Sequence, residues 1–375
     1  MRDKNIKILH LISSLEKGGA QGLLIDLAQR SDDYRHLIVS FKPGNTYEKI
    51  TQSKGVEIIT LNVRVFNFFS TFIKLLKIIF RFKPNIIQSW MYHADFMTIL
   101  LKPFIKKATF IWSFHHADPA NNNPFSYSIA KVCSKFSSLV PHILIACSSL
   151  TKKEHIAFGY DKSKIVVINN GVDQKKFKFK PKKKKSKDVP IIGFIGRWHT
   201  IKGHEIFIRA ASILSKKINS PKFIMIGTNI DIHNQDLKKI LKENNMYKKI
   251  DLYGEEVSDI RKYYEMMDIY VCASWSESFS LTLVESALQG IPIVSTDVGI
   301  ARNIIKDTEL ISKVGDFKKI ANSILRILNF GEKELEIYLN ENYKRASEKF
   351  TLDRMIIEYE GMYNKLALIE SSKRS

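Results

Sequence analysis

Two glutamates in the C-terminal half of the sequence are of a type and spacing that suit a hydroxylated ligand. Glu277 and Glu285 lie eight residues apart, and Glu285 is flanked by apolar residues, where a carboxylate is costly unless something binds it. A carboxylate can accept charge-assisted hydrogen bonds from two sugar hydroxyl groups. Between the two glutamates, the backbone N–H groups that open a predicted helix are suited to phosphate oxygens; these belong to Ser278, Phe279, Ser280 and Leu281.

Two cations earlier in the same half suit a diphosphate. Arg197 and Lys202 lie five residues apart in a glycine-bearing loop that leads from a predicted strand to a helix. Arginine offers a planar fork of donors, lysine a point charge, and the helix N-terminus a partial positive charge. On spacing alone, two unrelated surface cations also fit. A nucleotide-sugar has a central diphosphate with hydroxylated rings at both ends, so it would satisfy the cations and the carboxylates together.

A second glycine turn lies near the N-terminus. Gly18 and Gly19 stand between a predicted strand and a predicted helix, where backbone N–H groups can face an anion. The complete G-x-G-x-x-G sequence of dinucleotide-binding proteins is absent, so the signal is weak. Taken alone, a tight turn is the better explanation of these glycines.

Short apolar strands alternate with helices along the whole chain, which predicts two parallel sheets covered by helices on both faces. The expected fold class is α/β, with two doubly wound domains facing each other across a cleft. Ligands bind at the carboxyl ends of the strands in such sheets, which is where the residues above are placed. The predicted strands are 6–12, 36–40, 56–61, 85–89, 109–114, 143–146 and 164–168 in the first domain, and 191–195, 222–226, 250–253, 269–272 and 291–295 in the second.

Length and composition agree with this organisation. A chain of 375 residues with 45% hydrophobic and 26% charged residues predicts two globular domains. Three scattered cysteines favour a reducing compartment and not a disulfide framework. The N-terminal apolar run is interrupted by Lys7, and no run reaches the roughly 18 apolar residues that cross a bilayer, so we expect a cytoplasmic chain that at most sits on a membrane.

The net charge of +21 bears on partners. Residues 174–188 hold nine lysines and one aspartate, and we expect an exposed linker there between domains at 1–173 and 189–350. This linker is either a solvated spacer or a patch that is attracted to anionic lipid. The aromatic and basic helix predicted at 66–82 is either buried or lies in a membrane interface.

Taken together, these motifs resemble those of family 4 glycosyltransferases, which have the two-domain GT-B fold, particularly bacterial enzymes that build surface polysaccharides. The resemblance spans most of the chain. Its motifs are Gly18-Gly19, the stretch ending at His116, Ala146-Cys-Ser-Ser, Gly159-Tyr, Val167-Ile-Asn-Asn-Gly171-Val-Asp173, Gly196-Arg197 with Lys202-Gly203, the Glu277–Glu285 pair and Gly290-Ile-Pro292.

The resemblance implies a role for each candidate residue. Glu285 would hold the nucleotide ribose, Glu277 would face the donor sugar, and Arg197 and Lys202 would neutralise the leaving diphosphate. His116 would reach the donor sugar from the first domain, and the adjacent His115 is the alternative. The family usually works without a metal, so no cofactor is expected beyond the nucleotide-sugar substrate.

The function implied is retaining transfer of a sugar from a nucleotide-diphosphate donor to a lipid-linked or polysaccharide acceptor, as in lipopolysaccharide or capsule synthesis. We expect the enzyme at the inner face of the cell membrane as a peripheral protein, with residues 351–375 packing back on the first domain. Two alternatives are a nucleotide-sugar epimerase of the same fold and a basic nucleic-acid-binding protein. The first lacks a second set of paired acids, and the second lacks any recognised nucleic-acid module, so we expect no nucleic-acid partner.

Overall fold

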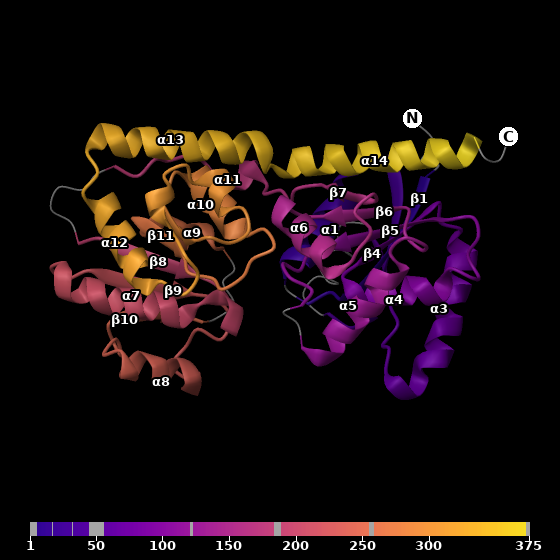
Figure 1. Cartoon of the computed structure of the whole chain (residues 1–375), viewed down its shortest axis with the longest axis horizontal. Helices are drawn as coiled ribbons and strands as arrows, with labels where there is room; N and C mark the ends of the chain where they lie inside the picture. The colour runs from indigo at the N-terminus through magenta and orange to yellow at the C-terminus, as the bar shows by residue number, and fades with distance from the viewer. Residues whose placement is uncertain are drawn as a thin grey trace. The chain divides into compact units, whose positions relative to one another are not determined.

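The computed structural model describes residues 6–16, 18–31, 33–44, 56–120, 123–183, 189–254 and 259–372. The chain divides into two compact units (Figure 1). Unit 1 consists of Met1–Gly171 together with Asp353–Ser375, and unit 2 consists of Val172–Leu352.

Unit 1 is built on a parallel sheet that has seven strands within the described residues, in the order β3-β2-β1-β4-β5-β6-β7. The strands are β1 (Ile6–Ser14), β2 (Tyr34–Lys42), β3 (Glu57–Thr60), β4 (Ile86–Trp90), β5 (Thr109–Phe114), β6 (Ile143–Ala146) and β7 (Ile165–Val167). The helices are α1 (Gly19–Arg30), α3 (Phe68–Phe82), α4 (Tyr92–Leu101), α5 (Pro124–Phe136), α6 (Ser149–Phe158) and α14 (Leu352–Ser372).

The sequence of unit 1 produces this sheet because its central strands have no exposed face. Every residue of β4 and β5 is buried, as expected for parallel strands that helices cover on both sides. Leu75 and Ile79 of α3 pack into the same core cluster as Leu9 and Ile87 of the sheet. The predicted strands of the first domain are all present.

The terminal helix α14 packs on unit 1. The hydroxyl group of Tyr34 donates hydrogen bonds to the carbonyl oxygen of Glu360 at 3.1 Å and to Oδ1 of Asn364 at 2.8 Å. The ring of Tyr359 stacks on Trp90 with centroids 6.3 Å apart, and the hydroxyl of Tyr363 bonds to the Gln88 side chain. These contacts fix α14 to strands β2 and β4.

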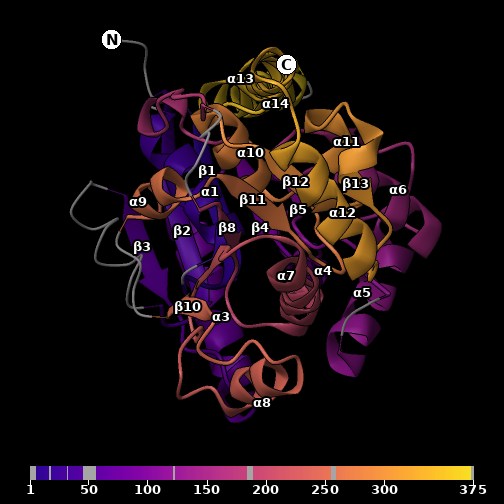
Figure 2. The same cartoon turned by 90° about the vertical axis from the view of Figure 1, so that its left-hand side faces the viewer.

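Unit 2 contains a second parallel sheet, with six strands within the described residues in the order β10-β9-β8-β11-β12-β13. Figure 2 shows the molecule from the side of unit 2. The strands are β8 (Ile191–Ile195), β9 (Lys222–Ile226), β10 (Ile250–Tyr253), β11 (Ile269–Cys272), β12 (Ile293–Thr296) and β13 (Ile311–Ser312). The helices are α7 (His204–Lys217), α8 (Gln235–Glu243), α9 (Arg261–Met266), α10 (Leu281–Gln289), α11 (Ala301–Ile304), α12 (Phe317–Leu328) and α13 (Glu332–Lys349). Strand β13, which the sequence did not predict, is two residues long and so has no periodic pattern.

The basic segment differs from the expected linker. Its described part, 174–183, belongs to unit 2, where the Phe177 side chain is buried against the ring of Tyr264. The backbone N–H groups of Lys180 and Lys182 donate to the carbonyl oxygens of Gln289 and Gly290. Phenylalanines that alternate with lysines explain the difference, because they give this charged segment an apolar anchor. Residues 184–188 lie outside the described part of the chain.

Candidate active site

The predicted site residues of unit 2 lie on loops at one edge of the sheet and in helix α10, which follows one of these loops. Because all of its strands are parallel, the loops that follow β8 and β11 leave from the same edge. The loop after β8 carries Arg197 and Lys202, and the loop after β11 carries Glu277 and leads into α10 with Glu285. The topology therefore brings the two cations and the two acids to one rim.

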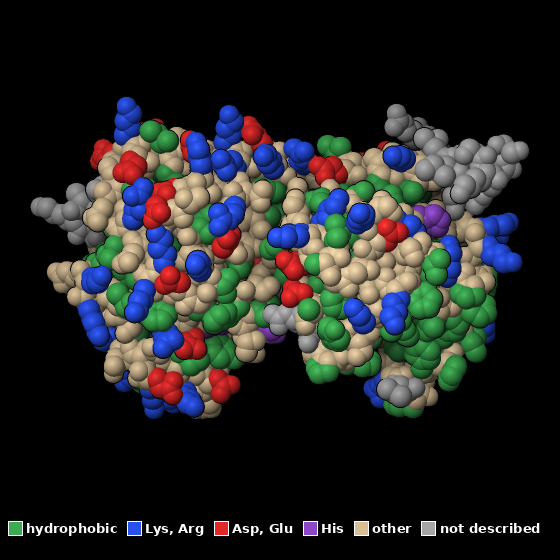
Figure 3. Space-filling model, viewed as in Figure 1, with side chains coloured by type: hydrophobic (Ala, Val, Ile, Leu, Met, Phe, Trp, Pro, Cys, Tyr) green, Lys and Arg blue, Asp and Glu red, His purple; other side chains and the backbone are tan. Residues whose placement is uncertain are grey.

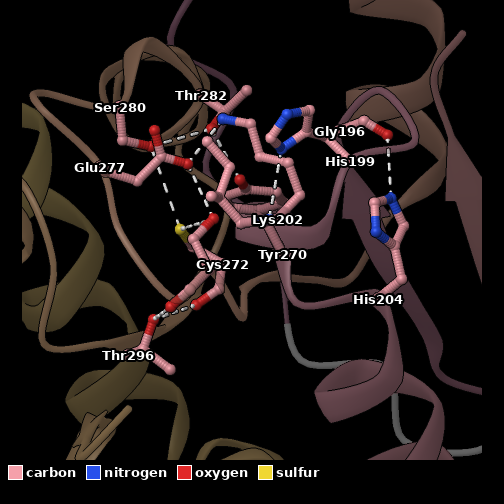
Figure 4. A network of polar contacts seen from close by, with 12 residues as sticks. Gly196, His199, Lys202, His204, Tyr270, Cys272, Glu277, Ser280, Thr282 and Thr296 are labelled. Carbon is pink, nitrogen blue, oxygen red and sulfur yellow. Dashed lines mark hydrogen bonds and ion pairs between the residues drawn. The ribbon is translucent and has the colours of Figure 1, made fainter. Parts of the chain in front are cut away.

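Lys202 and Glu277 form an ion pair at this rim. The Nζ atom of Lys202 lies 2.7 Å from Oε1 of Glu277 (Figure 4). The hydroxyl of Ser274 donates to the same oxygen at 2.7 Å. The two charged side chains are only 24% and 11% exposed, respectively. Water screens such a pair less than it screens a pair on the open surface, so the carboxylate is held in one place.

A glycine allows the two loops to approach closely enough for this pair. Gly203 has φ of 71°, and a Cβ atom there would lie 1.9 Å from the carbonyl oxygen of Ala273. The backbone N–H of Trp275 donates to the carbonyl oxygen of Ile201 at 2.7 Å. Only glycine combines this backbone conformation with so short an approach, so Gly203 determines where Lys202 meets Glu277.

The Arg197 side chain is exposed. Arg197 and Lys202 both lie near His199, where their positive charges act together. The pKa of His199 is lowered, first by burial and then by the positive charges of Arg197 and Lys202. Among the described residues, the guanidinium of Arg197 has no ion-pair partner. Arg197 and Lys202 therefore form a cationic corner at this end of the rim, in which the guanidinium N–H groups of Arg197 are available to a ligand.

Glu285 is held by a buried tyrosine. The hydroxyl group of Tyr264, on α9, donates to Oε2 of Glu285 at 2.8 Å, and the Tyr264 side chain is fully buried. Burial raises the pKa of Glu285, while the hydrogen bond from Tyr264 and the positive charge of Lys176 act in the opposite direction. The carboxylate is thus oriented by one strong donor and retains acceptor capacity for a ligand.

The two acids share a neighbourhood around Tyr270. Its hydroxyl donates to Oγ1 of Thr282 at 2.7 Å. Burial is the main cause that raises the pKa of Tyr270, and the negative charges of Glu277 and Glu285 both add to it. Both carboxylates therefore lie near the same phenol.

The start of α10 lies between the two acids. Ser280, which precedes it, has φ of 76°, and no side chain caps the helix N-terminus. Ser278 and Phe279 lie in the preceding loop, and Leu281 begins the helix. The first-turn N–H groups of α10 are therefore available to an anion that sits between the two glutamates.

A cavity of about 540 Å³ lies beside the Tyr264 side of this site. The basic segment lines one wall and α9 the other, and most of the charged side chains are cations. The residues that line it are Lys175, Lys176, Lys178, Lys180, Lys182, Asp259, Arg261, Lys262, Tyr264, Glu265, Gln289 and Ile291. The surroundings of Glu285 are therefore electropositive, as the effect of Lys176 on its pKa also indicates.

In unit 1, the candidate histidines follow β5. His115 stacks on Trp90, with ring centroids 4.9 Å apart, and His116 stacks on Tyr92 at 5.8 Å. Burial, and then the neighbouring His116, lower the pKa of His115 to about 3, so its imidazole is neutral at pH 7. Both side chains are half-buried, and both remain candidates for a contact with the donor sugar.

The glycine pair of unit 1 lies at the start of α1. Gly18 precedes the helix with an extended backbone and Gly19 is its first residue, and no side chain caps the helix there. The geometry is that of a strand-to-helix turn at the carboxyl end of β1. Among the described residues, there is no group of three or more His, Cys, Asp and Glu that could hold a metal ion.

Sequence reasoning missed Ser274, Tyr264 and Tyr270. The first two donate hydrogen bonds to the two candidate carboxylates, Glu277 and Glu285, and the third contacts α10. Ser274 lies only three residues before Glu277, so the sequence alone could have indicated a contact between them. Tyr264 and Tyr270 precede Glu285 by 21 and 15 residues, and only the folded chain brings them to it.

Comparison with known protein families accounts for nearly the whole chain. Residues 18–176 match the model described as Glycosyltransferase Family 4, and residues 175–346 match that of Glycosyl transferases group 1. The capsular polysaccharide biosynthesis glycosyltransferase CapM of Staphylococcus aureus is 24% identical over 378 residues, which cover 96% of this chain and 97% of CapM. CapH of the same organism is 23% identical over 78% of this chain and 82% of its own length.

Solved structures show the same fold. HepE of Anabaena, in its complex with UDP and glucose, superposes with a TM-score of 0.82 at 20% identity and covers 96% of this chain and 100% of its own. The lipopolysaccharide outer core galactosyltransferase WaaB superposes with a TM-score of 0.72 at 14% identity, over 96% and 100% of the two chains. These matches give no support to the epimerase alternative. The solved structures confirm the predicted GT-B fold. The family models and the capsular relatives confirm the rest of the prediction made from the motifs: the chain belongs to glycosyltransferase family 4 and is a glycosyltransferase.

Proposed function

We propose that this glycosyltransferase moves a sugar from a nucleotide-diphosphate donor to a lipid-linked or polysaccharide acceptor in the synthesis of a bacterial surface glycan. CapM and CapH support the class of pathway, since both are named for capsular polysaccharide biosynthesis. HepE supports the class of donor, since its structures hold UDP, UDP with glucose, and UDP-glucose. The proposed location is the inner face of the cell membrane.

The observation that carries the donor proposal is the pair of immobilised carboxylates beside a cationic corner. Glu285, oriented by Tyr264, accepts the ribose hydroxyls. Glu277, fixed by Lys202, faces the hydroxyls of the donor sugar. Arg197, Lys202 and the first N–H groups of α10 bind the diphosphate between them. Gly18 and Gly19 supply further N–H groups from unit 1.

The proposed chemistry is transfer with retention of configuration. The bond between the anomeric carbon and the diphosphate oxygen breaks, and its electron pair leaves with the diphosphate. The acceptor hydroxyl oxygen bonds to the same face of the sugar, and its proton passes to the leaving oxygen. Arg197 and Lys202 offset the negative charge that develops there, the work that a metal ion does elsewhere, so the proposal needs no metal. His116 contacts the donor sugar, with His115 as the alternative.

The hydrogen bonds that Glu277 accepts support a mechanism in which no side chain of the enzyme acts as the nucleophile. Its Oε1 atom already accepts from both Lys202 and Ser274, so the carboxylate is held by donors and is a poor nucleophile. A double displacement would need a free carboxylate under the anomeric carbon. The same-face route needs only that the diphosphate and the acceptor be held together.

Thermal-shift measurements over common nucleotide-sugars test the donor proposal, with UDP and UDP-glucose as the first probes. A donor at about a hundred times its Kd stabilises the fold by about 2.7 kcal/mol. We expect one nucleotide-sugar to raise Tm clearly, and Glu285→Gln and Arg197→Ala to abolish the rise. Arg209→Ala, on the exposed surface of α7, is the matched control. An equal rise in the Glu285→Gln variant would contradict the proposal.

The stereochemistry can be tested without the acceptor. Slow hydrolysis of the stabilising donor by water releases a sugar whose first-formed anomer is visible by NMR. Retention predicts the anomer of the donor itself. The opposite anomer would overturn the retaining mechanism while leaving the donor site intact, so the two parts of the proposal can fail separately.

A further inference from the structure

Helix α3 of unit 1 has a row of apolar side chains that the core leaves largely exposed. Its buried face consists of Thr71, Leu75, Ile79 and Phe82. A second apolar row lies outside that face, spaced by four, three and four residues, the spacing of one side of a helix; it consists of Phe69, Ile73, Leu76 and Phe80. Three of these four side chains are exposed, and Phe69 is 81% exposed.

Two further aromatic side chains extend this row beyond the helix. Phe66, just before α3, is 82% exposed, and Phe104 is 53% exposed. The ring of Phe104 contacts Phe72 of α3 edge to face, with centroids 5.9 Å apart. Hydrophobic side chains accordingly gather over α3 in the space-filling view (Figure 3). We call this set the aromatic surface: Phe66, Phe69, Ile73, Phe80 and Phe104.

Cations border the aromatic surface. Lys74, Lys77 and Arg81 repeat at three- and four-residue intervals on α3, so they form a row beside the apolar one, and all three are exposed. The guanidinium of Arg64 lies 5.7 Å from the centroid of the Phe66 ring. Lys106 is exposed as well, two residues from Phe104.

The region contains almost no negative charge. Between residues 61 and 107, eight lysines and arginines stand against one acid, Asp95, which is fully buried. The surface therefore exposes aromatic rings and positive charge, with no exposed acid. A protein partner would be recognised through charges of both signs. Exposed aromatic rings bordered by cations instead complement a lipid bilayer, which has an apolar interior and an anionic surface.

We propose that the aromatic surface inserts into the interface of an anionic lipid bilayer, with α3 lying in the plane of the membrane. The rings of Phe66, Phe69 and Phe80 enter the boundary between head groups and acyl chains. Lys74, Lys77 and Arg81 contact the lipid phosphates. No helix in the described part of the chain has the length and apolar character of a membrane span. This inference rests on the proposed membrane location, which it deepens by naming the surface that binds, and it does not depend on the donor site.

Co-sedimentation of the full chain with vesicles tests the proposal. We expect binding to vesicles of phosphatidylcholine with phosphatidylglycerol, weaker binding at high salt, and little binding to phosphatidylcholine alone. Changing Lys74, Lys77 and Arg81 to Gln should lower the partition coefficient by on the order of a hundredfold at low salt. Changing Phe69, Ile73 and Phe80 to Ser should abolish binding that persists at high salt. These positions are exposed, so Tm should change little.

Matched control variants show whether vesicle binding depends on this surface or only on the total charge and hydrophobicity of the protein. Changing Lys216, Lys217 and Lys222 to Gln removes the same charge from an exposed part of unit 2, and Ile232→Ser removes an exposed apolar side chain there. Neither control should change binding. Loss of binding in the lysine control equal to that in the α3 variant would overturn the proposal in favour of non-specific attraction.

The rival occupant is a second copy of the chain. Light scattering after size exclusion should give a monomer for both the wild type and the Ser variant. A dimer that dissociates in the Ser variant, in a protein that ignores anionic vesicles, would overturn the membrane proposal and make the aromatic surface a protein interface.

Discussion

Removing the hydroxyl group of Tyr264 should change the pH dependence of donor binding. The Tyr264 hydroxyl donates to Oε2 of Glu285 at 2.8 Å in a buried position, and this bond opposes the rise in the pKa of Glu285 that burial causes. A hydrogen bond to a charged group contributes about 1.5–3 kcal/mol. Loss of this bond disfavours the ionised carboxylate, so Tyr264→Phe should raise the pKa of Glu285 further.

The direction of the effect follows from which form of Glu285 binds ribose. The ionised carboxylate accepts both hydroxyl groups, so donor affinity is highest above the pKa of Glu285 and falls as the pH drops through it. In Tyr264→Phe, this fall should begin at a higher pH than in the wild type, because the pKa of Glu285 is higher there. Affinity at pH 8.5 should approach that of the wild type, because the carboxylate is ionised in both.

Titration calorimetry of the stabilising nucleotide-sugar between pH 5.5 and 8.5 measures this shift. Tyr270→Phe is the matched control, since it removes an equally buried phenol whose hydroxyl donates to the neutral Thr282. Its pH profile should follow that of the wild type. An affinity loss in Tyr264→Phe that is equal at every pH would refute the reasoning, because it would show that Tyr264 does not act through the ionisation of Glu285.

Three further outcomes are expected. Glu285→Gln and Arg197→Ala should each lower transfer at least about tenfold with Tm preserved; full activity in either purified variant would remove it from the donor site. Burial lowers the pKa of His155 to about 3, so between pH 7 and pH 5 the unfolded chain binds a proton there that the folded chain does not. This group alone should therefore lower the free energy of unfolding by about 2 kcal/mol as the pH falls from 7 to 5. Urea unfolding should show that slope, and a His155→Phe variant with the wild-type slope would contradict it. Gly203→Ala should lower Tm and donor affinity, because a Cβ would meet the carbonyl oxygen of Ala273, whereas Gly361→Ala in α14, where a Cβ meets nothing, should not.

The fold was largely predictable because its strands are short, continuous and apolar. Runs such as 109–114 and 143–146 favour buried strands, and the helical patterns between them favour parallel pairing. The two-residue strand β13 has too few residues to show a pattern. The sequence did not predict that residues 174–183 pack on the rest of unit 2. Their many lysines indicated an exposed linker, whereas the Phe177 side chain among them is buried.

The site was predictable as far as residue type and strand-end position allow. The sequence placed Arg197, Lys202 and Glu277 on loops at one sheet edge and Glu285 in the helix that follows, and the structure has them there. It did not predict that Lys202 pairs with Glu277, because that contact depends on the loop approach at Gly203. The bond from Tyr264 to Glu285 likewise depends on how α9 packs on α10, which no local pattern encodes.

A crystal structure of the protein with its stabilising nucleotide-sugar tests the central claim most directly. The account predicts ribose hydroxyls within hydrogen-bond distance of the Glu285 carboxylate and diphosphate oxygens on Arg197 and Lys202. A nucleotide bound with its ribose and diphosphate away from these three side chains would contradict it.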